Sequence, residues 1–226
     1  NSLQENYYAS VRGGGDIAQY FVSVGYRHEG AAYRQKENQF HQPLSYDQLT
    51  YRANINMNLT KRSELYFGVD GNISNYTTPG GKSTNDVWSD VLKLNPLMFP
   101  VAYADGTLPT YGQSDLISPF AALNYQGYRS TDKTRNMITL KFTHRFGGFL
   151  KGLVGSVQVV NDRTSAFNER RFVKPDYYRA TGRTSTGDLI KTLRSKQQDM
   201  SYSSSNDTWR KYYMEAKLNY NKNIGL

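Results

Sequence analysis

Apolar and polar residues alternate strictly from Leu49 to Leu59, a run that reads LTYRANINMNL. One set of alternate positions holds Leu, Tyr, Ala, Ile, Met and Leu, and the other holds an arginine, three asparagines and a threonine. Because successive side chains of a strand point to opposite faces, this pattern predicts a strand with one apolar and one polar face. The run is about twice as long as an ordinary strand and matches the roughly 9–11 residues with which a tilted strand crosses a bilayer. We therefore expect its apolar face to meet lipid and its polar face to meet water.

The same alternation recurs along the chain and predicts six further strands. They cover approximately residues 7–12, 20–27, 65–74, 137–143, 153–159 and 212–220. Between the strands, short glycine-rich or charged turns alternate with long polar segments, which cover residues 29–48, 75–133 and 161–209. Outer-membrane barrels have this arrangement, with tight periplasmic turns and large extracellular loops, whereas a soluble sandwich usually has short turns at both ends.

One short helix is predicted inside the longest polar segment. Ser83 or Thr84 is suited to cap its first turn. Val87, Val91 and Leu94 recur at the spacing that gives a helix one apolar face.

The fold class expected from these patterns is all-β, an antiparallel up-and-down segment of a transmembrane β-barrel with about seven strands. Seven strands are fewer than the minimum of about eight for a closed bacterial barrel, and alone they would leave two bare edges. We therefore expect other segments to complete the barrel, so that residues 1–226 form one partial domain. The residues expected to face the lumen are Arg52, Asn54, Asn56, Asp70, Asn72, Glu215 and Lys217. Among these, Asp70 and Glu215 are expected to be satisfied by the basic neighbours Arg52 and Lys217.

Composition narrows the choice of class. The mean hydropathy is −0.70, and no apolar run approaches the roughly 18–20 residues of a membrane helix. The absence of cysteine excludes disulfides and thiolate metal sites. The net charge is +9, but lysines and arginines are scattered over turns, polar faces and loops rather than gathered on one element. That distribution does not match the basic footprint of a nucleic-acid-binding protein, and we expect no nucleic-acid partner.

No motif in the chain predicts catalysis or a bound cofactor. The three histidines lack metal-ligand spacing, and no nucleophile–base or paired-carboxylate constellation can be assembled from spacing. The run TTPGGKST at residues 77–84 resembles a phosphate-binding loop, but Tyr76 stands where that motif requires its first glycine. We therefore expect a protein that is not an enzyme and that holds neither metal nor cofactor.

Four residues of the longest polar segment are candidates for ligand binding: Trp88, Tyr103, Asp105 and Tyr111. Their aromatic faces are suited to contact a sugar or a peptide. In the competing interpretation, Trp88 packs the predicted helix and Asp105 with Gly106 simply turns the chain.

Four runs resemble the SusC/RagA-like family of TonB-linked outer-membrane transporters. Residues 7–30 contain SVRGGGDIAQYFVSVGYRHEG, similar to an early hairpin of that family in which a V-S-G-G turn leads to a Q-Y-Y-x-S-x-G-Y strand and an E-G. The other runs are YRANINMNLTKRSELYFGVDGNIS at 51–74, NPLMFPVAYADGTLP at 95–109 and LNYNKNIG at 218–225. Their order and spacing cover most of the chain.

The resemblance implies a 22-stranded barrel in the bacterial outer membrane, with an N-terminal plug domain and a TonB box. It also implies import of oligosaccharides or peptides together with a SusD/RagB-like surface lipoprotein. The plug and the closing strands do not occur in this sequence, so the resemblance implies that residues 1–226 are an internal part of the barrel.

Two other classes remain open on the residues alone. A soluble β-sandwich that binds carbohydrate or peptide would pack its apolar faces against each other in two sheets. A carbohydrate-active enzyme would need two carboxylates about 5–10 Å apart across a cleft.

Overall fold

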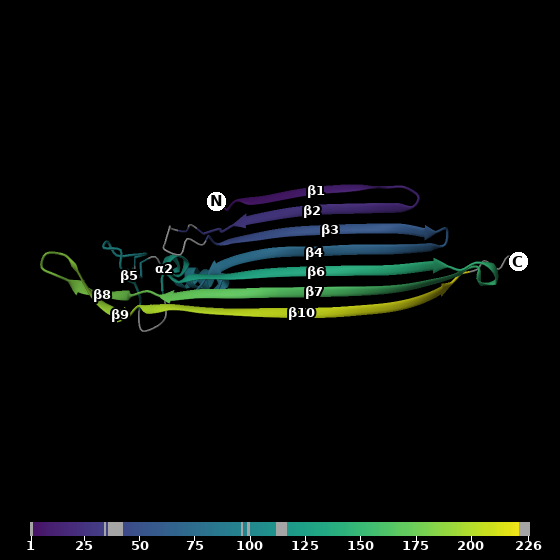
Figure 1. Ribbon diagram of the computed structural model, residues 1–226. Coiled ribbons are helices and arrows are strands. Elements are labelled where there is room, and N and C mark those ends of the chain that lie inside the picture. Colours follow the sequence, from purple (N-terminus) through teal and green to yellow (C-terminus); the bar gives the residue numbers. More distant parts are fainter. Residues whose placement is uncertain are drawn as a thin grey trace.

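The computed structural model describes residues 2–33, 35, 43–95, 97–98, 100–111 and 117–221. Its main element is an open, seven-stranded antiparallel sheet with the order β1-β2-β3-β4-β6-β7-β10 (Figure 1). The strands are β1 (Gln4–Gly14), β2 (Ala18–Gly30), β3 (Ser45–Thr60), β4 (Ser63–Pro79), β6 (Gly127–Arg145), β7 (Leu153–Lys174) and β10 (Gln198–Tyr220). The predicted set of seven antiparallel strands is confirmed, and the closure of the sheet into a barrel stays a prediction.

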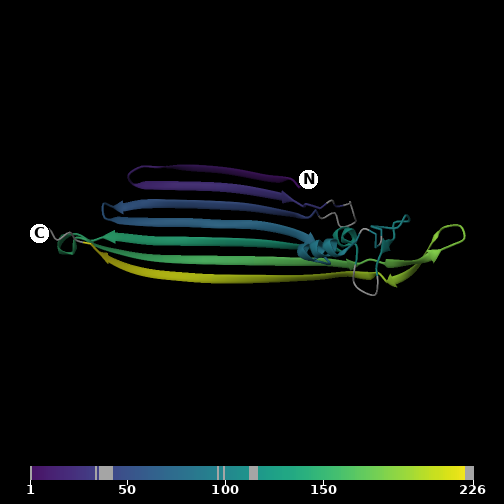
Figure 2. The same cartoon turned by 180° about the vertical axis from the view of Figure 1, so that it is seen from behind.

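The connections between these strands alternate in length, as predicted. Residues 15–17, 61–62 and 146–152 make the short connections, and all three lie at one end of the sheet, called here the turn end. The described parts of the long connections, within residues 31–44, 80–126 and 175–197, lie at the opposite end, called the loop end. The same separation is visible from behind (Figure 2).

Three strands are much longer than their apolar pattern predicted. The strands β6, β7 and β10 have 19, 22 and 23 residues, so the prediction that residues 161–209 form one polar loop was wrong. The added parts carry polar side chains on both faces, and period-two alternation of hydrophobicity is lost there. The ladder between neighbours continues regardless, with β6 paired to β7 as far as Gly127 and Phe172, because strand pairing depends on cross-strand partners as well as on burial.

Two helices and a small sheet gather at the loop end (Figure 1). They are α1 (Thr84–Lys93), α2 (Pro119–Tyr125) and a three-stranded sheet of β5 (Leu108–Pro109), β8 (Tyr177–Arg183) and β9 (Leu189–Ser195). A short 3-10 turn (Gly148–Leu150) lies at the turn end. At the loop end, buried side chains of α1, α2, the small sheet and the adjoining loops form one cluster: Leu44, Val87, Leu108, Ile117, Ala121, Ala122, Leu123 and Tyr177. This cluster fixes the loops to one another beyond the ends of the strands.

The helix predicted near residue 84 is confirmed as α1, with Ser83 as its N-cap. The Ser83 hydroxyl accepts a hydrogen bond from the Asp86 backbone N–H at 3.2 Å, and the Asp86 carboxylate accepts one from the Ser83 N–H at 3.2 Å. This reciprocal pair is a capping box. The predicted apolar face was wrong in one respect, because Val91 is 42% exposed. Val87 is buried, as predicted. Asp90 is buried as well and forms an ion pair with Lys82.

The register of the sheet brings the apolar sides of all seven strands onto one face. For example, Val22, Ala53, Val69 and Ile138 are successive partners in one row across β2, β3, β4 and β6. We call this set the apolar belt. Its members are Tyr7, Ala9 and Val11; Tyr20, Val22, Val24 and Tyr26; Leu49, Tyr51, Ala53, Ile55 and Met57; Leu65, Phe67, Val69 and Ile73; Ile138, Leu140 and Phe142; Val157 and Val159; and Tyr212, Met214, Ala216, Leu218 and Tyr220.

The apolar belt is open to the surroundings instead of being covered by another layer. Leu140 is 45% exposed, Val157 is 53% exposed and Met214 is 76% exposed. The buried apolar cluster of the described residues lies at the loop end and includes no member of the belt. The interior of the folded chain is therefore small, and its largest apolar surface faces outward.

Candidate functional site

The opposite face of the sheet is polar and hollowed. Register places the seven residues predicted to face the lumen on this one face: Arg52, Asn54, Asn56, Asp70, Asn72, Glu215 and Lys217. Three hollows of about 410, 560 and 730 Å³ lie on it. Each is lined mainly by side chains from the alternate strand positions that face the polar side of the sheet. This polar face is the candidate functional site.

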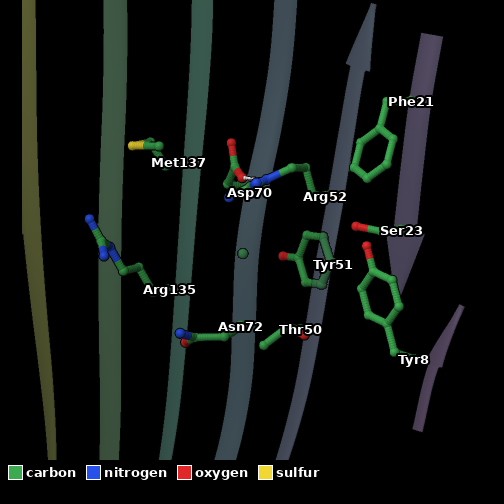
Figure 3. Close-up of a pocket in the computed structure, with 11 residues that line it drawn as sticks. Tyr8, Phe21, Ser23, Thr50, Tyr51, Arg52, Asp70, Asn72, Arg135 and Met137 are labelled. Carbon is green, nitrogen blue, oxygen red and sulfur yellow. Dashed lines mark hydrogen bonds and ion pairs between the residues drawn. The ribbon is translucent and has the colours of Figure 1, made fainter. Parts of the chain in front are cut away.

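Acidic side chains on the polar face are held by basic neighbours. Arg52 pairs with Asp70, and Lys217 pairs with Glu215 at 2.6 Å, so both predicted pairs are confirmed. Figure 3 shows Arg52 and Asp70 reaching toward each other between β3 and β4. Arg135 makes a two-pronged contact with Asp162, with Nε–Oδ1 at 3.0 Å and Nη2–Oδ2 at 2.7 Å. These pairs fix side chains that would otherwise extend into the hollows.

Positive charge nevertheless dominates this face. Its basic residues number twelve: Arg12, Arg27, Arg52, Arg129, Lys133, Arg135, Lys141, Arg145, Arg170, Lys174, Lys211 and Lys217. Its acidic residues number six: Glu29, Glu64, Asp70, Asp162, Asp207 and Glu215. Twelve minus six leaves a formal charge of +6 on the polar face of the seven strands. A concave face with one prevailing sign of charge attracts solutes of the opposite sign.

Trp88 lies beside the loop end of the polar face. It is half exposed on α1, and its ring centroid lies 5.3 Å from that of Tyr33. Both rings line a hollow of about 190 Å³, together with Tyr46 and Tyr76 at the ends of β3 and β4. Trp88 is thus in an aromatic cluster at the edge of the polar face, where it can contact a ligand as well as pack α1.

Tyr103 and Asp105 occupy a different place, against the β8–β9 hairpin. Tyr103 is buried, and its hydroxyl accepts a hydrogen bond from the Ala180 N–H at 3.0 Å. Asp105 accepts hydrogen bonds from the Thr107 N–H at 3.2 Å and the Thr107 hydroxyl at 2.7 Å, and it pairs with Lys191. Lys191, followed by Thr107, lowers the pKa of Asp105 to about 2. These contacts make Tyr103 and Asp105 anchors of the hairpin.

Tyr111 is the last of the four residues predicted to contact a ligand. It is 48% exposed and follows the short strand β5. Its assignment as a ligand contact stays a prediction.

Sequence reasoning did not single out the aromatic residues of the polar face. Tyr8 and Phe21 line the hollow of about 410 Å³, called here the central hollow, beside Arg52 (Figure 3). Tyr46 and Tyr76 are direct cross-strand partners, with ring centroids 6.2 Å apart at an interplanar angle of 70°. Extending the polar parity of β3 and β4 toward the loop end would have found the second pair.

Comparison with known proteins gives no match, either to a protein-family model or to a curated sequence. Among the described residues, no helix is long and apolar enough to cross a membrane. The same part of the chain contains no group of three or more His, Cys, Asp or Glu side chains that could hold a metal ion.

Proposed function

We propose that this chain forms part of the wall of an outer-membrane β-barrel. The barrel is that of a SusC/RagA-like, TonB-dependent importer of oligosaccharides or peptides. In this proposal the apolar belt faces lipid and the polar face lines the lumen. A SusD/RagB-like lipoprotein works with the loop end, and the TonB complex acts through a plug region outside this chain. The observation that carries the proposal is the exposed apolar belt, which crosses the sheet obliquely.

The slant of the belt corresponds to tilted strands. The cross-strand row that contains Tyr26 on β2 reaches Thr208 on β10, but the tyrosine at the loop-side edge of the belt on β10 is Tyr212, four residues further along. The row that contains Tyr20 reaches Met214 on β10, but the tyrosine at the turn-side edge of the belt there is Tyr220, six residues further along. Over five interstrand steps of about 4.8 Å, with about 3.3 Å per residue, these shifts give a tilt of roughly 29–40°. Strands of outer-membrane barrels tilt by about 35–45°.

The height of the belt supports the same assignment. From Tyr212 to Tyr220 the belt on β10 spans eight residue steps, which is about 26 Å along the strand and about 22 Å across the membrane at such a tilt. The apolar band of outer-membrane barrels is about 25 Å tall and is flanked by aromatic residues. Tyrosines stand at both edges of the belt on β2 and on β10.

The backbone of the sheet is also suited to lipid. Every interior strand is paired on both sides, and the ladders run without a register shift across the belt. A membrane wall requires such pairing because lipid offers no hydrogen-bond partners. The edge strands β1 and β10 each have one bonded neighbour among the described strands. In the proposal, further strands of the same barrel pair with these two edges.

The sandwich alternative requires a second layer over the belt. A sandwich packs the inner faces of two sheets about 10 Å apart and excludes water from the side chains between them. Here the belt side chains of β6, β7 and β10 are exposed, and the small sheet β5-β8-β9 packs into the loop-end cluster through Leu108 and Tyr177. The exposed belt therefore favours a membrane wall.

The test compares two neighbouring positions on β3, Ile55→Arg and Asn56→Arg, in the full-length protein. Ile55 belongs to the belt and Asn56 to the polar face. Arginine on the lipid-facing side costs about 2–4 kcal/mol near the midplane, whereas arginine on the lumen side stays hydrated. We expect the Ile55 variant to be lost from the outer-membrane fraction and the Asn56 variant to assemble normally. Equal assembly of the two variants would refute the proposed orientation.

The import function needs its own readout. Cells that carry the unaltered protein should accumulate labelled oligosaccharide or peptide in a TonB-dependent manner. Assembly without TonB-dependent uptake of either cargo would overturn the importer assignment and leave the barrel assignment intact.

A further inference from the structure

The largest of the three hollows described on the polar face lies toward the loop end, where a ligand entering the lumen arrives first. It encloses about 730 Å³ and is lined by Tyr46, Gln48, Asn72, Tyr76 and Lys133, among others. It shares Tyr46 and Tyr76 with the smaller aromatic hollow beside Trp88. It also shares Asn72 and Arg135 with the central hollow, in which both residues are visible (Figure 3). The hollows of about 190, 730 and 410 Å³ therefore form one track along the wall.

Aromatic rings and neutral polar groups make up much of this lining. The rings of Tyr46 and Tyr76 stand at 70° to each other, so their faces point in different directions over the hollow. Gln48, Asn72 and Ser74 place amide and hydroxyl groups next to these rings. Flat apolar faces beside hydrogen-bonding groups complement a sugar, which has apolar C–H faces and a rim of hydroxyls.

Lys133 gives the hollow an unneutralised positive charge. Two other cations of the lining are already committed, since Arg27 pairs with Glu29 and Arg135 pairs with Asp162. Lys133 is exposed and makes no ion pair with a described residue. Its ammonium group has three donors and is suited to hold an anionic group of a ligand. The excess of basic residues on the whole face would draw such a ligand inward.

A peptide is a poorer match to this hollow than a sugar. Peptides that bind along a sheet are recognised mainly through main-chain hydrogen bonds at a free strand edge. The hollow lies over β2, β3, β4 and β6, which are interior strands whose main-chain groups are used by their ladders. Recognition here must use side chains, and those available are aromatic, amide, hydroxyl and ammonium groups.

We propose that this hollow is a subsite for acidic oligosaccharides, in which Lys133 pairs with the carboxylate or sulfate of one sugar while Tyr46 or Tyr76 contacts the face of a ring. This inference rests on the proposed importer function and adds the class of cargo. It also assigns Lys133 as a residue that sets specificity for charge.

The test measures binding to the purified full-length protein in detergent by titration calorimetry at low salt. The probes are a short galacturonic-acid oligosaccharide, its carboxyl-reduced neutral analogue, a sulfated oligosaccharide and a poly-glutamate peptide. We expect the unaltered protein to prefer the acidic sugar to its neutral analogue. Lys133→Gln should weaken binding of the acidic sugar by about tenfold or more, the loss of one charge-assisted contact, and leave the neutral analogue unchanged. Lys133→Arg should restore most of the loss.

Lys141→Gln is the matched control. Lys141 is on the same strand and the same face as Lys133, is exposed, and lies nearer the turn end outside the lining of the hollow. Its loss changes the net charge equally, so a general electrostatic effect would weaken binding equally in both variants. Tyr46→Leu is expected to weaken the acidic and the neutral sugar alike, because contact with a ring face does not depend on charge.

The outcomes separate the subsite from the importer function. A neutral analogue that binds as well as the acidic sugar, or equal effects of the two lysine variants, would overturn the subsite while uptake and assembly stay intact. Lys133-dependent binding of poly-glutamate without binding of the acidic sugars would replace the sugar by an acidic peptide. A preference for the sulfated over the carboxylated sugar identifies the anionic group and upholds the proposal. Failure of the unaltered protein to assemble in the outer membrane would refute the importer function itself.

Discussion

The slant of the apolar belt predicts that two alanines in one cross-strand row respond differently to arginine. Ala18 on β2 and Ala216 on β10 occupy the same row, linked through Met57, Leu65 and Phe142 and then Val157 of β7. Both belong to the outward-facing parity. If the strands stood upright in the membrane, the two positions would lie at the same depth.

If the belt lies in lipid on tilted strands, as proposed, the two depths differ by about half the height of the belt. Ala216 is at the midpoint of the belt on β10, between Tyr212 and Tyr220. Ala18 is five residues from the midpoint of the belt between Tyr20 and Tyr26 on β2, or about 16 Å along the strand and about 13 Å along the membrane normal. Arginine costs about 2–4 kcal/mol at the midplane and about 0–1 kcal/mol near the interface. Ala216→Arg should therefore lower the folding equilibrium constant by roughly 30- to 1,000-fold, and Ala18→Arg by less than about tenfold.

The assay is urea titration of the full-length protein in lipid vesicles, followed by the heat-modifiable shift in gel mobility. Ala53→Arg serves as the positive control, because Ala53 lies one residue from the midpoint of the run from Leu49 to Leu59 on an interior strand. Equal costs at Ala18 and Ala216 would refute the tilt. No cost at Ala53 and Ala216 would refute the placement of the belt in lipid.

Two further predictions concern the loop end. Tyr177→Phe should destabilise the loop-end cluster by about 1–2 kcal/mol, because the buried Tyr177 hydroxyl accepts a hydrogen bond from Gln126 Nε2 at 3.2 Å and the amide would lose that partner. Chemical denaturation, followed by hydrogen exchange in α2, measures this loss. An unchanged exchange rate in α2 would contradict the prediction. The pKa of Asp105 is lowered from its ordinary value of 3.8 to about 2 by Lys191 and then Thr107, so its contact with the hairpin is fully present above about pH 4 and is lost as the pH falls toward 2. Hydrogen exchange of β9 should accelerate over that interval in the unaltered protein and show no such transition in Asp105→Asn, and a transition that persists in the variant would assign it to another group.

The parts of the fold that could be predicted are those where an element with one apolar face leaves a regular pattern in the sequence. The belt on β3, from Leu49 to Met57, alternates because one face is apolar, and its partners on β2 and β4 alternate in step. The Ser83 cap is visible for a local reason, since its partner Asp86 is three residues away. The pairs Arg52–Asp70 and Glu215–Lys217 could be predicted once it was known which residues share a face and which strands are neighbours.

The parts that could not be predicted depend on contacts between distant segments. The helix α2 has only seven residues, and its buried Ala121 and Ala122 are covered by side chains from other loops. The strands β5 and β8 pair through Leu108 and Tyr177, far apart in the sequence. The loop-end parts of β7 and β10 are polar on both faces, so they resemble loops in their composition although their ladder continues to Ser201 and Phe172.

The unequal lengths of the strands beyond the belt give the proposed wall a sloping rim. On β2 only residues 27–30 extend past Tyr26 toward the loop end, whereas on β10 residues 198–211 extend past Tyr212. At about 3.3 Å per residue and a tilt near 35°, these extensions rise about 11 Å and about 38 Å above the belt. The β8–β9 hairpin continues from the high side (Figure 1). The aromatic cluster around Trp88 includes Tyr46 and Tyr76 at the ends of β3 and β4, so it stands on the lower part of the rim. In the proposed wall, a ligand therefore reaches this cluster from the low side, and the taller strands β6, β7 and β10 stand beside the track of hollows that leads down the polar face.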